Sequence, residues 1–115
     1  MLFRSSPAER MTREAQELLA LVPDEAALVV FDERGRTVDS AAFAGFIGRE
    51  RDIGRKSLWF AVGGPEGLDE DVRRRAAAVY SFGSMTLPHQ LVRVLVAEQI
   101  YRAMTILSGH PYHRG

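Results

Sequence analysis

Cysteine is absent from the 115 residues of this sequence. Its absence excludes disulfide scaffolds, zinc sites built on thiolates and thiol catalysis, and it favours a reducing compartment such as the cytoplasm. Long apolar runs are also missing, because the apolar stretches are only a few residues long, far short of a membrane span. The first ten residues hold no apolar segment typical of a signal peptide, so we expect no membrane partner.

What is present fits a globular protein, with 46% hydrophobic and 26% charged residues. The length leaves room for one core, so we expect a single domain over residues 1–115. Two unbroken apolar runs, at residues 27–31 and 58–62, are typical of strands buried on both faces of a parallel sheet. They alternate with helical patterns, which predicts an α/β fold with a parallel sheet.

Capping residues predict the helix boundaries. Ser6-Pro7-Ala8-Glu9 has the pattern of a capping box with proline at the first helical position, and this helix should end before Pro23. A second helix is expected from Asp39 or Ser40 to near Gly48, and a third, capped by Asp69, over residues 72–79. The chain should then be extended or looped at residues 80–87 and helical at about 89–107.

The net charge is zero, but the charges are unevenly distributed. From residue 73 onward there are six arginines and one acidic residue, Glu98, and all three histidines lie there as well. Such a basic segment suits an anionic ligand such as a nucleic acid. Equally, the acidic N-terminal part can neutralise the basic C-terminal part within one fold, so charge alone leaves both interpretations open.

The expected last helix carries apolar residues in nearly every direction, while Arg93 and Arg102 project from opposite sides. Such a helix must be covered all round. In a chain of this size the sheet can cover one side, and a second subunit is the natural cover for the other, which predicts a homodimer. The alternative is a helix wholly buried within one subunit.

Three segments contain residues suited to binding or chemistry. Gly63-Gly64-Pro65-Glu66-Gly67 follows a buried strand, where ligands bind in open α/β sheets, although a tight turn has the same composition. Residues 81–89 can offer backbone groups and apolar side chains to an adenine, or form an extended edge strand and a helix start. The tail at 110–114 contains a tyrosine able to stack on a base and an arginine able to bind a phosphate, or is a frayed end.

Taken together, these segments resemble the ribosomal large-subunit pseudouridine methyltransferase H family, a branch of the SPOUT (α/β-knot) methyltransferases. The resemblance is close from Gly63 to the end and looser over residues 8–60. It rests on four blocks in order: Gly63-Gly64-Pro65-Glu66-Gly67-Leu68, Thr86-Leu87-Pro88-His89-Gln90-Leu91-Val92-Arg93-Val94-Leu95, Glu98-Gln99-Ile100-Tyr101-Arg102-Ala103 and His110-Pro111-Tyr112-His113-Arg114.

The resemblance implies a SPOUT-type parallel sheet whose C-terminal segment threads through a loop as a trefoil knot, in a homodimer. It implies that S-adenosyl-L-methionine binds in the knot and that the substrate is a pseudouridine of 23S rRNA on the ribosome, methylated at ring nitrogen 3. The positions carried over for the cofactor are Phe31, Gly63, Gly64, Phe82, Gly83, Ser84, Met85, Thr86 and Leu87.

The same resemblance implies roles for the basic C-terminal residues. His113, or a water it positions, would assist loss of the ring imide proton, and Arg114 would stabilise the resulting anion. Arg102, Tyr112 and His89 would shape the pocket at the dimer interface, where the partner's tail would complete the site. The sulfonium methyl is already electrophilic, so no metal is expected, and the two tail histidines lack a nearby carboxylate in sequence.

The sequence differs from the family pattern in two places. Family members begin with a strand–helix–strand unit before the counterpart of the Ser6-Pro7 helix, and its absence here predicts an unpaired sheet edge. Gly83 replaces a common serine. These differences leave a second hypothesis, a catalytically inactive knotted dimer that binds rRNA or S-adenosylmethionine. A third, an unrelated nucleotide-binding α/β protein, would need a phosphate-binding loop that the sequence lacks.

Overall fold

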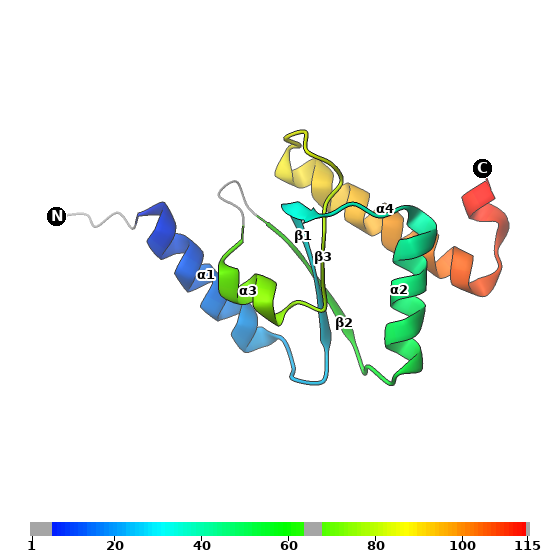
Figure 1. Cartoon of the computed structure of the whole chain (residues 1–115), viewed down its shortest axis with the longest axis horizontal. Coiled ribbons are helices and arrows are strands. Elements are labelled where there is room, and N and C mark those ends of the chain that lie inside the picture. Colours follow the sequence, from blue (N-terminus) through cyan, green and yellow to red (C-terminus); the bar gives the residue numbers. More distant parts are fainter. Residues whose placement is uncertain (1–5, 64–67, 115) are drawn as a thin grey trace.

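The computed structural model describes residues 6–63 and 68–114, with the side chains of Pro7 and Arg114 excepted. Helices and strands alternate along the chain (Figure 1). Their bounds are α1 Pro7–Leu21, β1 Ala27–Arg36, α2 Ser40–Asp52, β2 Leu58–Val62, α3 Glu70–Arg75, β3 Ala78–Tyr80, α4 His89–Ser108 and the short 3₁₀-helix η1 Pro111–Arg114. The prediction of an α/β fold with a parallel sheet is confirmed over the described residues.

The described sheet has three parallel strands in the order β2-β1-β3, so β1 lies in the middle. Its side chains alternate between the two faces. Val29 and Phe31 pack in one core with residues of α2 and α4, while Leu28 and Val30 pack in a second core with residues of α1 and α3. Because helices cover both faces of β1, every residue from position 27 to 31 must be apolar, which explains the unbroken run.

The predicted helix starts are confirmed at three caps. The side chains of Ser6, Asp39 and Asp69 each accept a backbone N–H from the first turn of α1, α2 and α3. Of the two candidates for α2, the capping residue is therefore Asp39, while Ser40 Oγ donates to Gln99 Oε1 of α4 at 2.7 Å. The helix α4 ends at Gly109, whose φ of 78° lies in the left-handed region that glycine adopts readily.

Three predicted boundaries are wrong. The strand β1 continues to Arg36, beyond the polar residues expected to end it, because Arg36 still pairs with Tyr80 of β3. The helix α2 continues past Gly48 to Asp52, since Gly48 packs against α4 instead of ending the helix. The helix after Asp69 ends at Arg75, and residues 78–80, expected to be helical in part, form β3. Pairing with β1 there overrides the local helical pattern.

Within the described residues, α4 is covered on the side that faces the sheet, while its opposite side is covered only in part, near η1, where Thr105 is buried. Val96 and Ala103 are buried in the core shared with α2, as expected for the side that faces the sheet. Four large apolar side chains of the helix remain exposed: Leu91, Val94, Tyr101 and Met104. At about 100° per residue they share the face opposite Val96 and Ala103. The uncovered side that the sequence predicted is therefore present in the structure.

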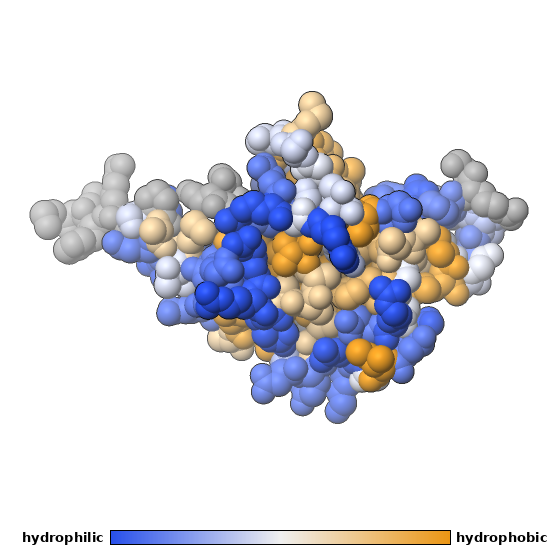
Figure 2. Space-filling view, viewed as in Figure 1, coloured by the Kyte–Doolittle hydropathy of each residue, from blue (hydrophilic) through white to orange (hydrophobic). Residues whose placement is uncertain are grey.

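The end of β1 lies directly against β3. Ser81 N–H donates to Arg36 O at 3.0 Å, and a β-carbon added to Gly35 would lie 2.6 Å from the carbonyl carbon of Tyr80. Only glycine permits this backbone contact. Figure 2 shows apolar atoms at the surface over the middle of the sheet, between the hydrophilic surfaces of the flanking helices. No helix in the described ranges is long and apolar enough to cross a bilayer.

Candidate functional site

A cavity of about 450 Å³ lies at the carboxyl ends of the three strands. Phe31, Val62 and Tyr80 contribute from the strand ends, and the segment between β3 and α4 contributes most of the rest. Open α/β sheets bind ligands at this edge, and the volume is in the range of small-molecule sites. The further lining residues are Asp32, Glu33, Arg34, Gly63, Ser81, Phe82, Gly83, Met85, Thr86, Leu87, Pro88, His89 and Val92.

Aromatic rings form one wall of this cavity. The rings of Phe31 and Phe82 are stacked, with centroids 5.2 Å apart and planes 11° from parallel. Phe31 also contacts Phe43 edge-on and Tyr80 at a tilt, so it is held from the core side. Burial is the main influence that raises the pKa of the Tyr80 hydroxyl, which therefore stays neutral at ordinary pH. The wall is an apolar surface suited to a flat ring.

The turn after β3 is closed by its own side chain. Ser81 Oγ accepts the Gly83 N–H at 3.0 Å and donates to Gly83 O at 2.9 Å. Gly83 has a φ of 123°, a conformation that residues other than glycine rarely adopt. This turn places Phe82 against Phe31 and exposes Met85 beyond it.

Gly63 is held from two directions at the end of β2. Its N–H donates to Phe31 O at 2.9 Å, and its carbonyl lies 3.0 Å from Nδ1 of His89, at the start of α4. A β-carbon at position 63 would lie 3.3 Å from both Asp32 Oδ2 and Leu68 Cγ. Glycine therefore lets the backbone at position 63 pack closely against Asp32 and Leu68 while it lines the cavity.

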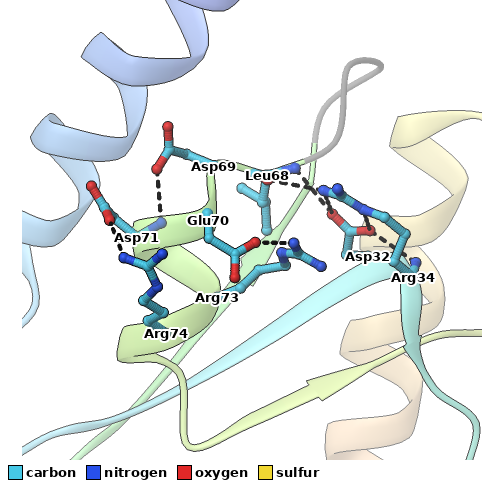
Figure 3. A network of polar contacts seen from close by, with 8 residues as sticks. All are labelled: Asp32, Arg34, Leu68, Asp69, Glu70, Asp71, Arg73 and Arg74. Atoms are coloured by element: carbon cyan, nitrogen blue, oxygen red, sulfur yellow. Dashed lines mark hydrogen bonds and ion pairs between the residues drawn. The ribbon is translucent and has the colours of Figure 1, made fainter.

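Asp32 and Arg34 were not singled out from the sequence, and Figure 3 shows the network they form with Leu68. Asp32 Oδ2 accepts the Leu68 N–H at 3.0 Å, while Oδ1 accepts from Arg34 N at 2.9 Å and Nε at 3.2 Å. Burial is the largest single influence on this carboxyl and opposes ionisation. The hydrogen bonds from Arg34 and Leu68 outweigh it, so the pKa of Asp32 lies below its usual value. A carboxylate directly after a buried strand was the signal available in sequence.

Arg102 and His113, two of the three predicted catalytic residues, lie in a second cluster on α4 and η1. Arg102 Nε donates to Glu98 Oε1 at 2.8 Å, and Arg102 Nη1 lies 3.0 Å from His113 Nδ1. The Arg102 guanidinium carbon is 5.0 Å from the centre of the Tyr112 ring, which meets Tyr101 edge-on. A cation on an aromatic face and an ion pair thus order this part of the tail.

The structure brings the predicted cofactor residues together but separates them from this tail cluster. From His89 to Arg102 the helix α4 rises about 20 Å at ~1.5 Å per residue, and Figure 1 shows η1 (red) at the far end of α4 from the yellow loop at its start. His89, predicted for the substrate, lines the cavity, whereas Tyr112 lies with Arg102. Ser84 is exposed and does not line the cavity.

Two predicted residues lie outside what the structure describes: Gly64 and the side chain of Arg114. Within the described ranges, histidine, aspartate and glutamate side chains do not gather in groups of three that could hold a metal ion.

Comparison with known proteins gives a family. Residues 3–113 match the family described as "Predicted SPOUT methyltransferase". The chain is 55% identical over 107 residues to the ribosomal RNA large subunit methyltransferase H of Nitrobacter hamburgensis, covering 93% of this chain and 67% of the relative. To the enzyme of the same name from Rhodopseudomonas palustris it is 57% identical over 107 residues, again covering 93% of this chain and 67% of the relative. To that of Rhizobium meliloti it is 54% identical over 112 residues, covering 96% and 70%.

The chain thus spans about two thirds of the length of these curated relatives. The match runs through both parts of the molecule described above, the cavity at the strand ends and the cluster on α4 and η1. Together with the three-stranded parallel sheet, it shows that the chain belongs to the SPOUT methyltransferase family.

Proposed function

We propose that this protein methylates ribosomal RNA, transferring the methyl group of S-adenosyl-L-methionine to ring nitrogen 3 of a pseudouridine in 23S rRNA. The observation that carries the proposal is the cavity at the strand ends, lined by Phe31, Gly63 and Phe82 in a chain 55% identical to a ribosomal RNA methyltransferase. Such a substrate belongs to the bacterial cytoplasm. The resemblance of the four C-terminal blocks supports the choice of pseudouridine and of nitrogen 3.

The cavity suits S-adenosylmethionine in shape and chemistry. Gly63 lines the cavity, and the lack of a side chain lets its backbone pack tightly against Asp32 and Leu68 in the cavity wall. Phe31, Phe82 and Leu87 offer apolar faces to an adenine ring. The loop residues Gly83, Met85 and Thr86, together with the Gly64 and Ser84 positions implied by the resemblance, would complete the binding site.

When bound, S-adenosylmethionine supplies an electrophilic methyl group on a sulfonium. The chain's own residues must then hold the pseudouridine ring in line and help its imide N–H lose a proton. We assign proton removal to His113 or a water it positions, and stabilisation of the imide anion to Arg114. Arg102 Nη1 lies 3.0 Å from His113 Nδ1, and because a guanidinium can only donate, this contact must be released before Nδ1 can accept a proton. His89 and Tyr112 would shape the nucleotide pocket.

A homodimer would bring the two clusters together. Within one chain the tail cluster lies roughly 20 Å along α4 from the cavity, too far for His113 to act there. The exposed apolar face of α4, formed by Leu91, Val94, Tyr101 and Met104, supplies a surface for a second copy. We therefore propose that the tail of one subunit completes the cavity of its partner.

We also propose that the C-terminal segment threads through a loop as a SPOUT trefoil knot. The close backbone contact between Gly35 and Tyr80, and the hydrogen bond from Ser81 N–H to Arg36 O, support it. These contacts hold the start of the C-terminal segment tightly against the end of β1, which any threading there requires.

The test is transfer of labelled methyl from S-adenosylmethionine to ribosomes that lack the modification, with the modified nucleotide mapped afterwards. Incorporation at a single pseudouridine, at nitrogen 3, is the expected result. Cofactor binding measured by calorimetry without any incorporation would instead support the catalytically inactive knotted dimer. If the chain neither bound S-adenosylmethionine nor incorporated label, both of these functions would be contradicted.

A further inference from the structure

Leu68 is held by both of its backbone polar groups. Its N–H donates to Asp32 Oδ2 at 3.0 Å, and its carbonyl accepts from Arg34 Nη2 at 2.9 Å (Figure 3). Asp32 and Arg34 are themselves joined by an ion pair, Nε to Oδ1, at 3.2 Å. The side chains of Asp32 and Arg34 in β1 therefore both hydrogen-bond to the backbone of Leu68, which lies 36 and 34 positions further along the chain.

Holding Leu68 in this way requires a carboxylate. The Asp32 side chain is only 2% exposed, and among the described residues its two oxygens accept from the Leu68 N–H, the Arg34 N–H and the Arg34 guanidinium. An amide of the same shape would turn an NH₂ group toward one of these donors. Because the site is buried and charged, this mismatch costs more free energy than the loss of one hydrogen bond.

Leu68 lies next to Gly63, a residue of the cavity wall. Leu68 Cγ and Asp32 Oδ2 would both lie 3.3 Å from a β-carbon on Gly63, which lines that cavity. Gly63 N–H is in turn bonded to Phe31 O, one residue before Asp32. The residues on either side of positions 64–67, Gly63 and Leu68, are thus both tied to adjacent residues of β1.

We propose that Asp32 and Arg34 are positioning residues for the cofactor, acting as a clamp on the backbone of Leu68 that sets the place of Gly63 in the cavity wall. The inference rests on the proposed function, because it assumes that S-adenosylmethionine occupies this cavity. Although both residues line the cavity, we assign their effect to positioning through Leu68 and Gly63, and exchange of the Leu68 amide without cofactor distinguishes this from direct contact. Their effect therefore falls on cofactor binding and leaves the binding of RNA unchanged.

The experiment compares Asp32→Asn, Arg34→Gln and the double variant with the wild-type chain, using calorimetry with S-adenosylmethionine. Asp52→Asn is the matched control, because Asp52 forms an exposed ion pair with Arg51. We expect Asp32→Asn to weaken cofactor binding about 10- to 100-fold, the effect of losing a charged hydrogen bond. Because Asp32 and Arg34 hold the same residue, the double variant should lose little more cofactor affinity than Asp32→Asn alone.

Two further measurements distinguish positioning from general damage. In methyl transfer, the KM for S-adenosylmethionine should rise, while kcat at saturating cofactor and the KM for ribosomes stay unchanged. Amide hydrogen exchange of Leu68 should become faster in Asp32→Asn even without cofactor. If Asp32→Asn does not fold, Arg34→Gln carries the same measurements, because the carboxylate bond to the Leu68 N–H remains.

Unchanged cofactor affinity in the single variants, or losses that add in the double variant, would overturn the clamp. A raised KM for ribosomes with unchanged cofactor affinity would overturn it as well. Failure of the wild-type chain to bind S-adenosylmethionine would instead contradict the proposed function. In that case Leu68 exchange would still show whether Asp32 and Arg34 hold its backbone.

Discussion

The rings of Phe82 and Phe31 are stacked, with their centroids 5.2 Å apart, and both residues line the cavity. Phe82 is 39% exposed and Phe31 only 5%, so the outer ring shields the inner one. The pair joins the end of β1 to the loop after β3, two segments that the sequence separates by about 50 residues. An aromatic stack at the wall of a cavity offers a flat surface to a ligand's ring.

Replacing Phe82 tests this wall. We expect Phe82→Ala to weaken S-adenosylmethionine binding by roughly 3- to 10-fold, the value of one aromatic contact. Phe82→Leu, which keeps an apolar side chain, should lose less. The melting temperature should fall little in either variant because Phe82 is partly exposed. Calorimetry and thermal unfolding give the two readings, and equal affinity in all three proteins would mean that the ring is no part of the site.

Adding one methyl group at Gly63 should damage the cavity. In Gly63→Ala the new β-carbon would lie 3.3 Å from Asp32 Oδ2 and Leu68 Cγ, so the surrounding atoms must move. We expect weaker cofactor binding and a loss of roughly 1–3 kcal/mol in the free energy of unfolding, as for overpacking. Calorimetry and urea unfolding measure both effects.

Gly45→Ala is the matched control for this substitution. Gly45 lies inside α2, and an added β-carbon meets only the end of the flexible Arg49 side chain, at 3.4 Å. Alanine should therefore stabilise the fold by about 0.5–1 kcal/mol through helix propensity and leave cofactor affinity unchanged. The opposite order of stabilities would contradict the packing described around Gly63.

The turn at Gly83 should tolerate no other residue without cost. Its φ of 123° is a strained conformation for alanine, so Gly83→Ala should lose roughly 1–3 kcal/mol of stability and displace Phe82. Gly54, with a φ of 88° and open space around it, is a control with a similar strain that lies away from the cavity. Both variants should unfold more easily in urea, but only Gly83→Ala should also weaken cofactor binding.

A dimer that shares its sites can be tested by complementation. One variant carries a defective cavity, Gly63→Glu, and the other lacks function in the tail, His113→Ala combined with Arg114→Ala. If each tail serves the partner's cavity, mixing the two inactive proteins should restore up to about a quarter of wild-type methyl transfer, since mixed dimers contain one intact site. Activity that stays at zero in verified mixed dimers would place cavity and tail in the same subunit.

The exposed face of α4 should hold that dimer together. Val94→Asp places a charge on the apolar face that Leu91 and Met104 share, so we expect a monomer in light scattering. Gln16→Asp, at an exposed position of α1, offers a control that leaves this face of α4 unchanged. A wild-type chain that is monomeric at all concentrations would remove this role of α4.

Acid should weaken the fold through Asp32. Its pKa in the folded state lies below the ordinary 3.8, so the ionised carboxylate stabilises the fold fully above that value. This contribution is lost as the pH falls through the folded-state pKa, below 3.8. Urea unfolding from neutral pH down to about pH 3 should show the advantage of wild type over Asp32→Asn shrinking only at the acid end. A gap that is constant with pH would show that Asp32 is not held as an anion.

Local sequence patterns determined much of the fold. The unbroken apolar runs identify β1 and β2 because helices cover both faces of a parallel sheet, and the capping side chains of Ser6, Asp39 and Asp69 set three helix starts. The proposed cofactor residues are predicted only through resemblance, since a glycine-rich loop and a mixed polar loop have the same composition as ordinary turns. The order of the four family blocks along the chain is what distinguishes these loops from ordinary turns.

Only the tertiary structure decided features that depend on residues distant in sequence. The strand β3 exists because Ala78, Val79 and Tyr80 pair with β1, although their local pattern continues a helix. The clamp of Asp32 and Arg34 on Leu68 and the stack of Phe82 on Phe31 arise where the carboxyl ends of parallel strands meet. The distance along α4 between His89 and Arg102 likewise follows from helix geometry, and it separates the predicted catalytic residues from the cavity of their own chain. Periodicity reports which face of an element is buried, whereas contacts between elements depend on how the whole chain packs.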